Sequence, residues 1–155
     1  MKTTQRQRSL AKGAVAGLIG GLVATAAKTA IEKIYPPRPR GEQKPPVLEE
    51  TSSKRGLALV RKAAASPTAN WGLGAATGAA YGALAEFYPA ATAKEGASFG
   101  MALVALTHDG ALPALGLTAR PESQTVREKS SELASHIVYG VVTETVRRVV
   151  RRMIA

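Results

Sequence analysis

Glycines recur at every fourth position in two separate apolar stretches of this chain. The first set is Gly13, Gly17 and Gly21, and the second set is Gly74, Gly78 and Gly82. A glycine inside a water-exposed helix costs about 1 kcal/mol relative to alanine, so three at this spacing suit a soluble helix poorly. Within lipid, the same spacing makes a flat groove that another helix can approach closely. The spacing therefore predicts two membrane helices whose glycines serve helix packing.

Four apolar segments divide the chain, and we expect helices over residues 10–34, 70–88, 95–112 and 124–153. Prolines close the first two segments, and no alternating β pattern competes with the helical one. Alanine and glycine supply much of the 45% apolar fraction, while aromatic residues make up only 5%. This composition favours closely packed helices. The predicted fold is all-α, an integral membrane four-helix bundle that forms one domain over residues 1–155.

A long basic loop over residues 35–69 is expected between the first two helices. Its first half is rich in proline and charge and should be extended. Its second half, residues 52–65, has the pattern of a short amphipathic helix, with leucines and a valine on one face and basic residues on the other. Such a helix would lie on the membrane surface or be a solvated charged helix.

The membrane interpretation has a soluble alternative. A spanning helix needs about 20 mostly apolar residues, but the uncharged cores here are shorter, at residues 13–27, 71–85 and 96–107. The mean hydropathy of −0.03 is also low for a membrane protein. An Ala/Gly-rich chain can produce regular glycine spacing by chance. A soluble helical bundle therefore remains the alternative on hydropathy alone.

The formal charge of +10 at first suggests a nucleic-acid-binding protein. The basic residues, however, flank apolar runs instead of forming one face, which is typical of membrane topology. We therefore expect no nucleic-acid partner and place both termini in the cytoplasm. The basic 38–62 segment would then be periplasmic, against the positive-inside tendency, so the orientation stays open.

Ionisable residues lie inside or at the ends of the apolar segments, where they are costly and point to a function. In an antiparallel bundle, the ends of helices one and three meet the starts of helices two and four, so six of these residues should gather on one side. They are Lys28, Glu32, His108, Asp109, Glu132 and His136. Glu86 and Glu144 should form a second polar pair at the opposite side, within reach of Arg147 or Arg148.

Three roles fit the predicted cluster. It could fix helix packing, it could pass protons through its two histidines, or it could ligate a divalent metal. The pattern contains neither HExxH nor a paired ExxH motif, so no metal site is assigned. The chain has no cysteine, no Walker loop, no dinucleotide fingerprint and no GxSxG motif. We therefore assign no catalytic residue and no cofactor, and we expect a protein that is not an enzyme.

Three stretches in the second half of the chain resemble one family. They read AEFYP at 85–89, LTHDGALPALGLT at 106–118 and SELASHIVYGVVTETVRR at 131–148. Taken in this order, and with PPR at 36–38, they are similar to the YagU-like family of small bacterial inner-membrane proteins of unknown function. The resemblance marks six positions as family-type: Glu86, Pro89, His108, Glu132, His136 and Glu144. This chain departs from the family in being shorter, richer in alanine and glycine, and more basic in its loop.

The sequence thus leads to three hypotheses of function. The first is a small accessory or assembly-type protein of the inner membrane, in which the polar cluster and the glycine faces organise helix packing. The second is a proton-linked transport or pH-response protein that uses His108, His136 and Glu132. The third is a soluble basic helical protein that binds anionic polymers. Under the first hypothesis the partners are the lipid bilayer and either further copies of the chain or a larger membrane complex.

Overall fold

The computed structural model describes residues 8–37, 66–110, 114 and 124–154. Within these ranges the fold is all-α, and it is a four-helix bundle without strands. The long helices are α1 (Leu10–Ile34), α3 (Pro67–Phe87) and α6 (Val126–Met153), and α4 (Ala97–Thr107) is shorter. A 3-10 segment, η2 (Pro89–Gly96), joins α3 to α4. The amphipathic helix predicted over residues 52–65 lies outside the described residues.

The helix starts follow local capping chemistry. Ser9 caps α1 by accepting a hydrogen bond from the backbone N–H of Lys12, and Ser66 caps α3 in the same way for Ala69. At α6, Thr125 and Glu128 form a reciprocal capping box. Each such cap satisfies backbone donors that the first helical turn leaves without partners. The Ser-Pro pair at 66–67 also explains why α3 begins three residues before the predicted position 70, since proline is favoured at the first helical position.

The predicted third helix was too long at both ends. Residues 95–112 were expected to be helical, but α4 covers only Ala97–Thr107 and residues 108–110 form a turn. At the start, Lys94 and Glu95 have φ angles of 50° and 56°, and Gly96 has φ 91°. Glycine tolerates this left-handed conformation, which lets the chain reverse between η2 and α4. The corner is thus a sharp change of direction instead of a helical turn.

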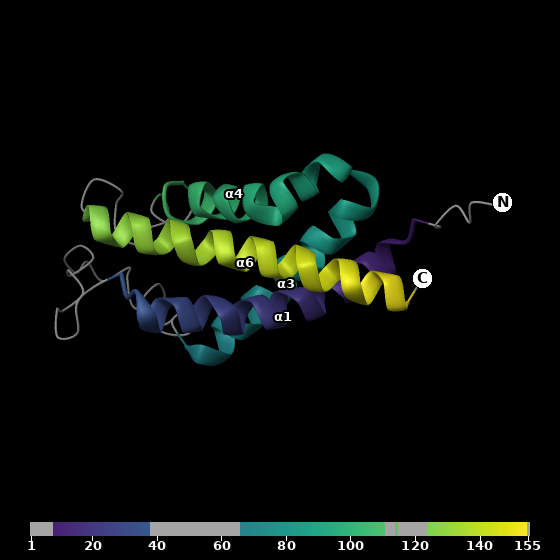
Figure 1. Ribbon diagram of the computed structural model, residues 1–155, viewed down its shortest axis with the longest axis horizontal. Helices are drawn as coiled ribbons and strands as arrows, with labels where there is room; N and C mark the ends of the chain where they lie inside the picture. Colours follow the sequence, from purple (N-terminus) through teal and green to yellow (C-terminus); the bar gives the residue numbers. More distant parts are fainter. Residues whose placement is uncertain (1–7, 38–65, 111–113, 115–123, 155) are drawn as a thin grey trace, which may run out of the picture.

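The helices alternate in direction. α1 runs antiparallel to both α3 and α6, and α4 runs antiparallel to α6 (Figure 1). The start of α1 therefore lies beside the end of α6 and the end of α3. We call this side, which also carries η2, the η2 end. The other side, where α1 finishes and α6 begins, is the opposite end.

The six glycines singled out in the sequence lie at one interface, between α1 and α3. A Cβ atom built at Gly17 would lie 2.7 Å from the Cα of Gly82, and one built at Gly78 would lie 2.6 Å from the Cα of Gly21. Both distances are shorter than real Cβ contacts. The two backbones therefore touch directly, as expected of small residues at four-residue spacing. On α6, Gly140 lies against Gly96 and Gly100 in a similar way.

The interior of the bundle is polar and its exterior is apolar. Among the described residues, the buried apolar side chains are only Ala16, Ala24, Tyr81 and Tyr139. Fully buried polar residues include Ser131, Ser135, Thr143 and Glu144, all on α6. Large apolar residues lie outside instead, among them Val15, Leu18, Ile19, Val23, Leu73, Leu84, Met101 and Leu106. A soluble domain normally shows the reverse distribution.

One helix in the part of the chain that the structure describes, α1, is long and apolar enough by length and composition to cross a membrane. Four such helices were expected from the sequence. α4 has 11 residues, which is too short for a span, and α6 carries many charged residues. A single helix near the N-terminus is weak evidence, since the core helix of a soluble protein or a signal sequence passes the same test.

Candidate functional site

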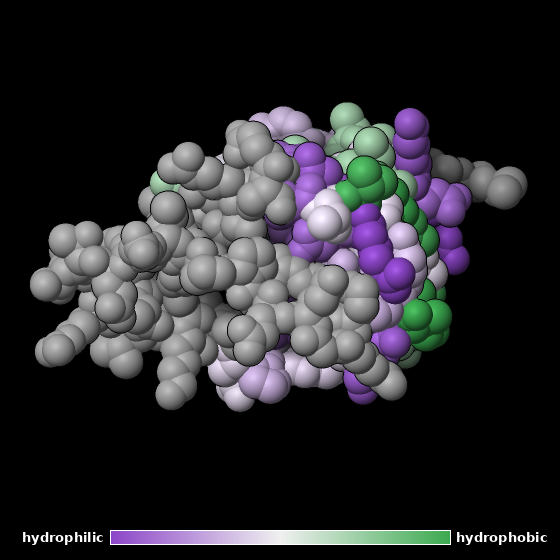
Figure 2. All heavy atoms as spheres, turned by 90° about the vertical axis from the view of Figure 1, so that its left-hand side faces the viewer, coloured by the Kyte–Doolittle hydropathy of each residue, from purple (hydrophilic) through white to green (hydrophobic). Residues whose placement is uncertain are grey.

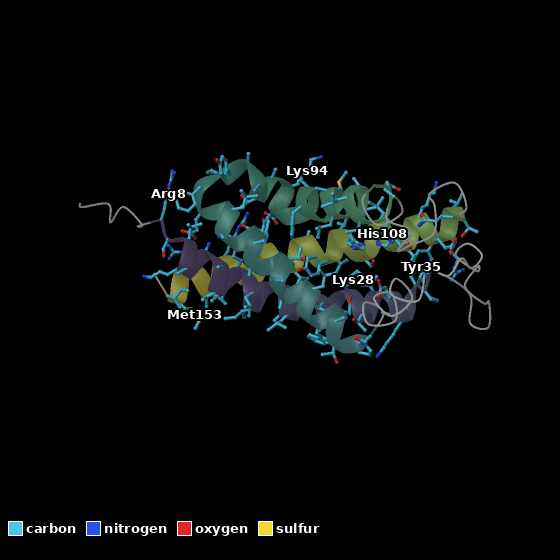
Figure 3. The ribbon with its side chains drawn as sticks, turned by 180° about the vertical axis from the view of Figure 1, so that it is seen from behind. Arg8, Lys28, Tyr35, Lys94, His108 and Met153 are labelled. Atoms are coloured by element: carbon cyan, nitrogen blue, oxygen red, sulfur yellow. The ribbon has the colours of Figure 1, made fainter. Side chains whose placement is uncertain are left out.

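Two polar clusters occupy the interior, one toward each end. Toward the η2 end lies the arginine–carboxylate cluster, which we define as Glu86, Glu144, Arg147, Arg148 and Arg151. Toward the opposite end lies a cavity lined in part by His108 and His136, which we call the histidine cavity. Figure 3 shows Lys28 and His108 on the side of Tyr35, with Arg8 and Met153 at the far side of the molecule.

Glu86 ties three helices together at the η2 end. Its two carboxylate oxygens accept hydrogen bonds of 2.7 and 3.0 Å from Nε and Nη2 of Arg151 on α6. The backbone N–H of Ser9, the cap of α1, donates to Oε2 at 3.2 Å. Arg147 lies 3.9 Å from Oε1. A paired arrangement of this kind is strong because the planar guanidinium matches both oxygens.

Glu144 is fully buried and accepts from three side chains. Nε and Nη2 of Arg147 bind its two oxygens at 2.7 and 2.9 Å, and Arg148 Nε lies 2.5 Å away. The hydroxyl of Tyr81, on α3, donates to Oε2 at 2.9 Å. The ring of Tyr81 stacks on Phe99 of α4 at a centroid distance of 4.1 Å. Glu144 thus connects α6 to α3, and Tyr81 extends the connection to α4.

The two histidines meet near the opposite end. Their ring centroids lie 5.0 Å apart in an edge-to-face arrangement. His108 Nδ1 lies 3.1 Å from a carboxylate oxygen of Glu132, and His136 Nδ1 lies 2.8 Å from the backbone carbonyl of the same residue. A carbonyl only accepts, so His136 Nδ1 donates and its Nε2 is left as an acceptor in the neutral ring.

All four helices contribute to the histidine cavity, whose volume is about 300 Å³. Its lining consists of Thr25, Lys28, Asn70, Leu73, Gly74, Thr77, Leu103, Thr107, His108, His136 and Tyr139. On one side, the hydroxyl of Tyr139 donates to the carbonyl of Gly74 at 2.6 Å, which links α6 to α3 beneath the cavity. The lining includes an ammonium group and two imidazoles but no carboxylate.

The sequence matches a family described as "Protein of unknown function (DUF1440)" over residues 22–145, most of the chain. The chain belongs to this family. No curated protein and no solved structure matches it. The DUF1440 match includes every histidine and carboxylate of the two clusters. It ends before Arg147, Arg148 and Arg151, which hold the carboxylates at the η2 end.

The structure brings most of the predicted cluster together. Lys28 and Glu32 form an ion pair along α1, and the ammonium of Lys28 reaches the histidine cavity. His108, His136 and Glu132 are in contact as described above. Asp109 is exposed and does not line the cavity. Glu86 and Glu144, the second polar pair of the sequence analysis, lie toward the η2 end with Arg147 and Arg148.

Sequence reasoning missed three contributors to the interior. Arg151 belongs to the basic run that follows the last apolar stretch of the sequence, yet its side chain is 2% exposed and binds Glu86. Tyr81 and Tyr139 were not singled out, although each donates a hydrogen bond between helices. Arg151 follows Glu144 and Arg147 at helical spacing, so it lies on their face of α6. That spacing could have indicated that Arg151 faces the interior. The partners of Tyr81 and Tyr139 are distant in sequence, so no local pattern indicates them.

Over the described ranges, no group of three or more His, Cys, Asp or Glu side chains is placed to hold one metal ion. His108, His136 and Glu132 are in contact with one another but do not form such a group. Glu132 contacts His136 through its backbone carbonyl, and its carboxylate contacts His108. The site is therefore best described as a polar cavity beside a histidine pair.

Proposed function

We propose that this DUF1440 protein is a YagU-like, multi-pass protein of the bacterial inner membrane. In this proposal it is not an enzyme but a small accessory or assembly-type subunit. Its polar interior and its glycine faces fix the arrangement of the helices. The observation that carries the proposal is the inverted distribution of polarity, with serine, threonine, glutamate and arginine inside and large apolar side chains outside.

The outer surface between the two ends is free of formal charge in the described helices. No charged residue occurs from Gly13 to Ala27 in α1, from Pro67 to Ala85 in α3, or in α4. In α6, the stretch from Leu133 to Val146 contains one charged residue, Glu144, and it is buried. A continuous apolar belt of this kind suits lipid and would be a liability in water.

Polar interior residues account for the low hydropathy of α6. Buried groups such as Ser135, Thr143 and Glu144 lower the mean hydropathy of α6 even though they face protein. The uncharged stretch of α1 from Gly13 to Ala27 is about 22 Å long at 1.5 Å per residue. A hydrocarbon core is about 30 Å thick. Lys12, which is exposed, can extend toward the interface at the start of α1 and make up part of the difference.

Charged side chains mark both ends of the belt. Figure 2 faces the opposite end and shows hydrophilic side chains there, with hydrophobic ones toward the rim of the coloured part. Exposed charges at this end include Lys33, Arg127 and Lys129. At the η2 end, Arg8, Lys12 and Arg152 are exposed. We propose that the η2 end, where α1 starts and α6 ends, is cytoplasmic.

The accessory role is supported by how completely the interior charges are matched. Glu86 and Glu144 are both held by arginines of α6, and Glu86 also binds the cap of α1. Such pairing holds the helices in one arrangement. A fixed arrangement suits a subunit on which other membrane proteins assemble. The outer faces of α3 and α4 are apolar and lie away from α1. In this proposal they meet lipid, further copies of the chain or other membrane subunits.

The first test is carbonate extraction of membranes from cells that make the tagged protein, followed by size analysis in detergent. We expect the protein to stay in the membrane and to elute as a particle larger than one copy. Retention with elution as a single copy would support the membrane placement but contradict the assembly role. Release into the soluble fraction would contradict the membrane proposal and favour a soluble basic protein that binds anionic polymers.

The orientation can be tested with single cysteines, because the chain contains none. Lys94→Cys lies at the η2 end and Lys129→Cys at the opposite end, and both positions are exposed. In intact cells a membrane-impermeant maleimide should label Lys129→Cys and leave Lys94→Cys unlabelled until the membrane is opened. The reverse pattern would invert the orientation, and equal labelling of both would contradict a spanning bundle.

A second candidate function, proton handling, is favoured by the contact between His108 and His136. Histidine is the side chain that most readily changes charge near neutral pH. Glu132 from α6 and Lys28 from α1 are the charged groups beside the pair. A proton-linked role predicts that His136→Ala abolishes a pH-dependent flux in vesicles while the bundle stays folded. A purely structural role predicts lost stability with no flux in either protein.

A further inference from the structure

The proposed role in helix packing does not explain the histidine cavity. Its volume of about 300 Å³ lies at the lower limit of the range found for small-molecule sites. A cavity of this size weakens a bundle whose other contacts are close, because its walls lose packing partners. A bundle that is built only for stability has no need of it. Among the described residues no side chain fills the cavity, so it has room for a ligand.

The polar side of the cavity presents hydrogen-bond donors to a ligand head group that can accept them. Lys28 and the two histidines line it, whereas Glu32 and Glu132, which contact Lys28 and His108, are not part of the lining. The ammonium of Lys28 has three donors, and Glu32 takes one of them. The lining residues Asn70 and Thr77 make no side-chain hydrogen bond within the described parts of the chain. Several donors thus remain for a ligand.

The other side of the cavity is apolar and opens between α3 and α4. Leu73 and Leu103 form its walls, and Leu73 is 65% exposed. The stack of Tyr81 on Phe99 holds α3 and α4 together toward the η2 end. Away from that stack α3 diverges from α4, and Lys28 and His108 are seen in the space between them (Figure 3). The opening therefore faces the apolar belt, which in the proposal above is lipid.

We infer that the histidine cavity binds an amphiphile with an anionic head and an acyl chain. The head lies against Lys28 and the donors around it, and the chain leaves between α3 and α4 along Leu73 and Leu103. The inference relies on the proposed membrane placement only for the source of the ligand. Both a free fatty acid and an acidic phospholipid have this chemistry, and the experiment distinguishes them.

The single tryptophan of the chain provides a direct reporter. Trp71 lies on α3 between the lining residues Asn70 and Leu73. Bromine quenches tryptophan emission at short range, so the purified protein in detergent is titrated with dibromostearate and, separately, with dibrominated phosphatidylglycerol. We expect saturable quenching by at least one of them and competition by the unbrominated compound. Quenching by the fatty acid alone, or by the phospholipid alone, identifies the source.

Two pairs of variants separate the cavity from unspecific uptake into the micelle. Lys28→Met should weaken binding roughly ten- to hundredfold, because it removes a charge-assisted hydrogen bond, whereas the exposed Lys33→Met should leave it unchanged. Thr77→Phe fills the cavity and should abolish saturable quenching. Ala80→Phe places the same ring on the exposed face of α3 and should not. Circular dichroism and thermal midpoints establish that each variant is folded.

Several results would overturn the inference. Quenching that never saturates, or that is equal in Thr77→Phe and Ala80→Phe, would show that the acyl chain does not enter the cavity. Equal binding of dibromostearyl alcohol and dibromostearate would remove the argument for an anionic head. Because the titration uses purified protein, it stands apart from the carbonate extraction. If carbonate releases the protein from the membrane but the purified protein still binds stearate, the proposed location is wrong and the binding site is supported.

Discussion

Glu86 and Arg151 are 65 positions apart in the sequence, yet two hydrogen bonds join their side chains across the α3–α6 interface. Both are almost fully buried, with side-chain exposures of 8% and 2%. A buried ion pair gives little net stability relative to apolar residues, but it is costly to break on one side only. The pair therefore acts as a constraint on how α3 and α6 meet.

Removing Glu86 alone should destabilise the bundle strongly. In Glu86→Ala the guanidinium of Arg151 stays buried without this carboxylate, which costs about 3–5 kcal/mol in comparable cases. Unfolding in mild detergent, followed by circular dichroism, measures the change. The double variant Glu86→Leu with Arg151→Met should recover much of the loss, and the exposed Arg152→Met serves as the control. A Glu86→Ala protein as stable as the parent would show that the pair imposes no constraint.

The α1–α3 contact should not tolerate a side chain at its glycines. A Cβ at Gly78 meets the backbone of Gly21, which cannot move aside, so Gly78→Val should cost about 3 kcal/mol or more. Gly72 lies on the same helix and has no atom within 4 Å of its would-be Cβ. Gly72→Ala should be neutral or stabilising by up to about 1 kcal/mol. Comparing the two unfolding midpoints tests the contact, and similar values would argue against it.

The hydroxyl group of Tyr81 should contribute to the stability of the bundle through its hydrogen bond to Glu144. Tyr81→Phe keeps the stack on Phe99 but removes the donor to the buried carboxylate of Glu144. A hydrogen bond to a charged group contributes about 1.5–3 kcal/mol, and we expect a loss of that size. Tyr88→Phe is the matched control, because the Tyr88 side chain is 64% exposed. Equal midpoints for the two variants would mean that Glu144 is satisfied by its arginines alone.

A charge on the outer belt distinguishes lipid from water around the bundle. Ile19 is half-exposed near the middle of α1, so Ile19→Asp in a bilayer should cost about 2.5–3.5 kcal/mol of insertion free energy. The fraction of protein that carbonate leaves in the membrane should fall. Val126→Asp, at the exposed start of α6, should behave like the parent. If water surrounds the bundle, Ile19→Asp would instead be neutral or more soluble.

Much of the fold could be predicted because short-range sequence patterns determine most of the helices and one of their contacts. Glycine spacing identified both sides of the α1–α3 contact, and apolar runs gave the first helix as Leu10–Ile34. The antiparallel arrangement of the helices also predicted that Glu86 and Glu144 lie at the other end of the bundle from the histidines. The short α4 was predicted poorly, since the left-handed corner at Lys94–Gly96 depends on packing of Gly96 against Gly140. The local sequence does not encode that contact.

The ion pairs and hydrogen bonds between buried side chains were harder to predict from the sequence than the helices were. A run of arginines at a helix end usually faces water or lipid head groups, and nothing in the sequence near Arg151 shows that Glu86 lies beside it. The hydrogen bonds of Tyr81 and Tyr139 are likewise formed with residues more than 60 positions away. The cavity follows from the angle between α3 and α4, which is a property of the assembled helices.

The direct backbone contact between α1 and α3 has a consequence for motion in the molecule. Two helices that meet without intervening side chains have nothing to rearrange at their interface, so they can only move as one rigid unit. α4 is held to α6 in the same way, because Gly96 and Gly100 lie directly against the α6 backbone at Gly140 and His136. If the space around His108 and His136 widens or closes, α3 should therefore move together with α1, and α4 together with α6.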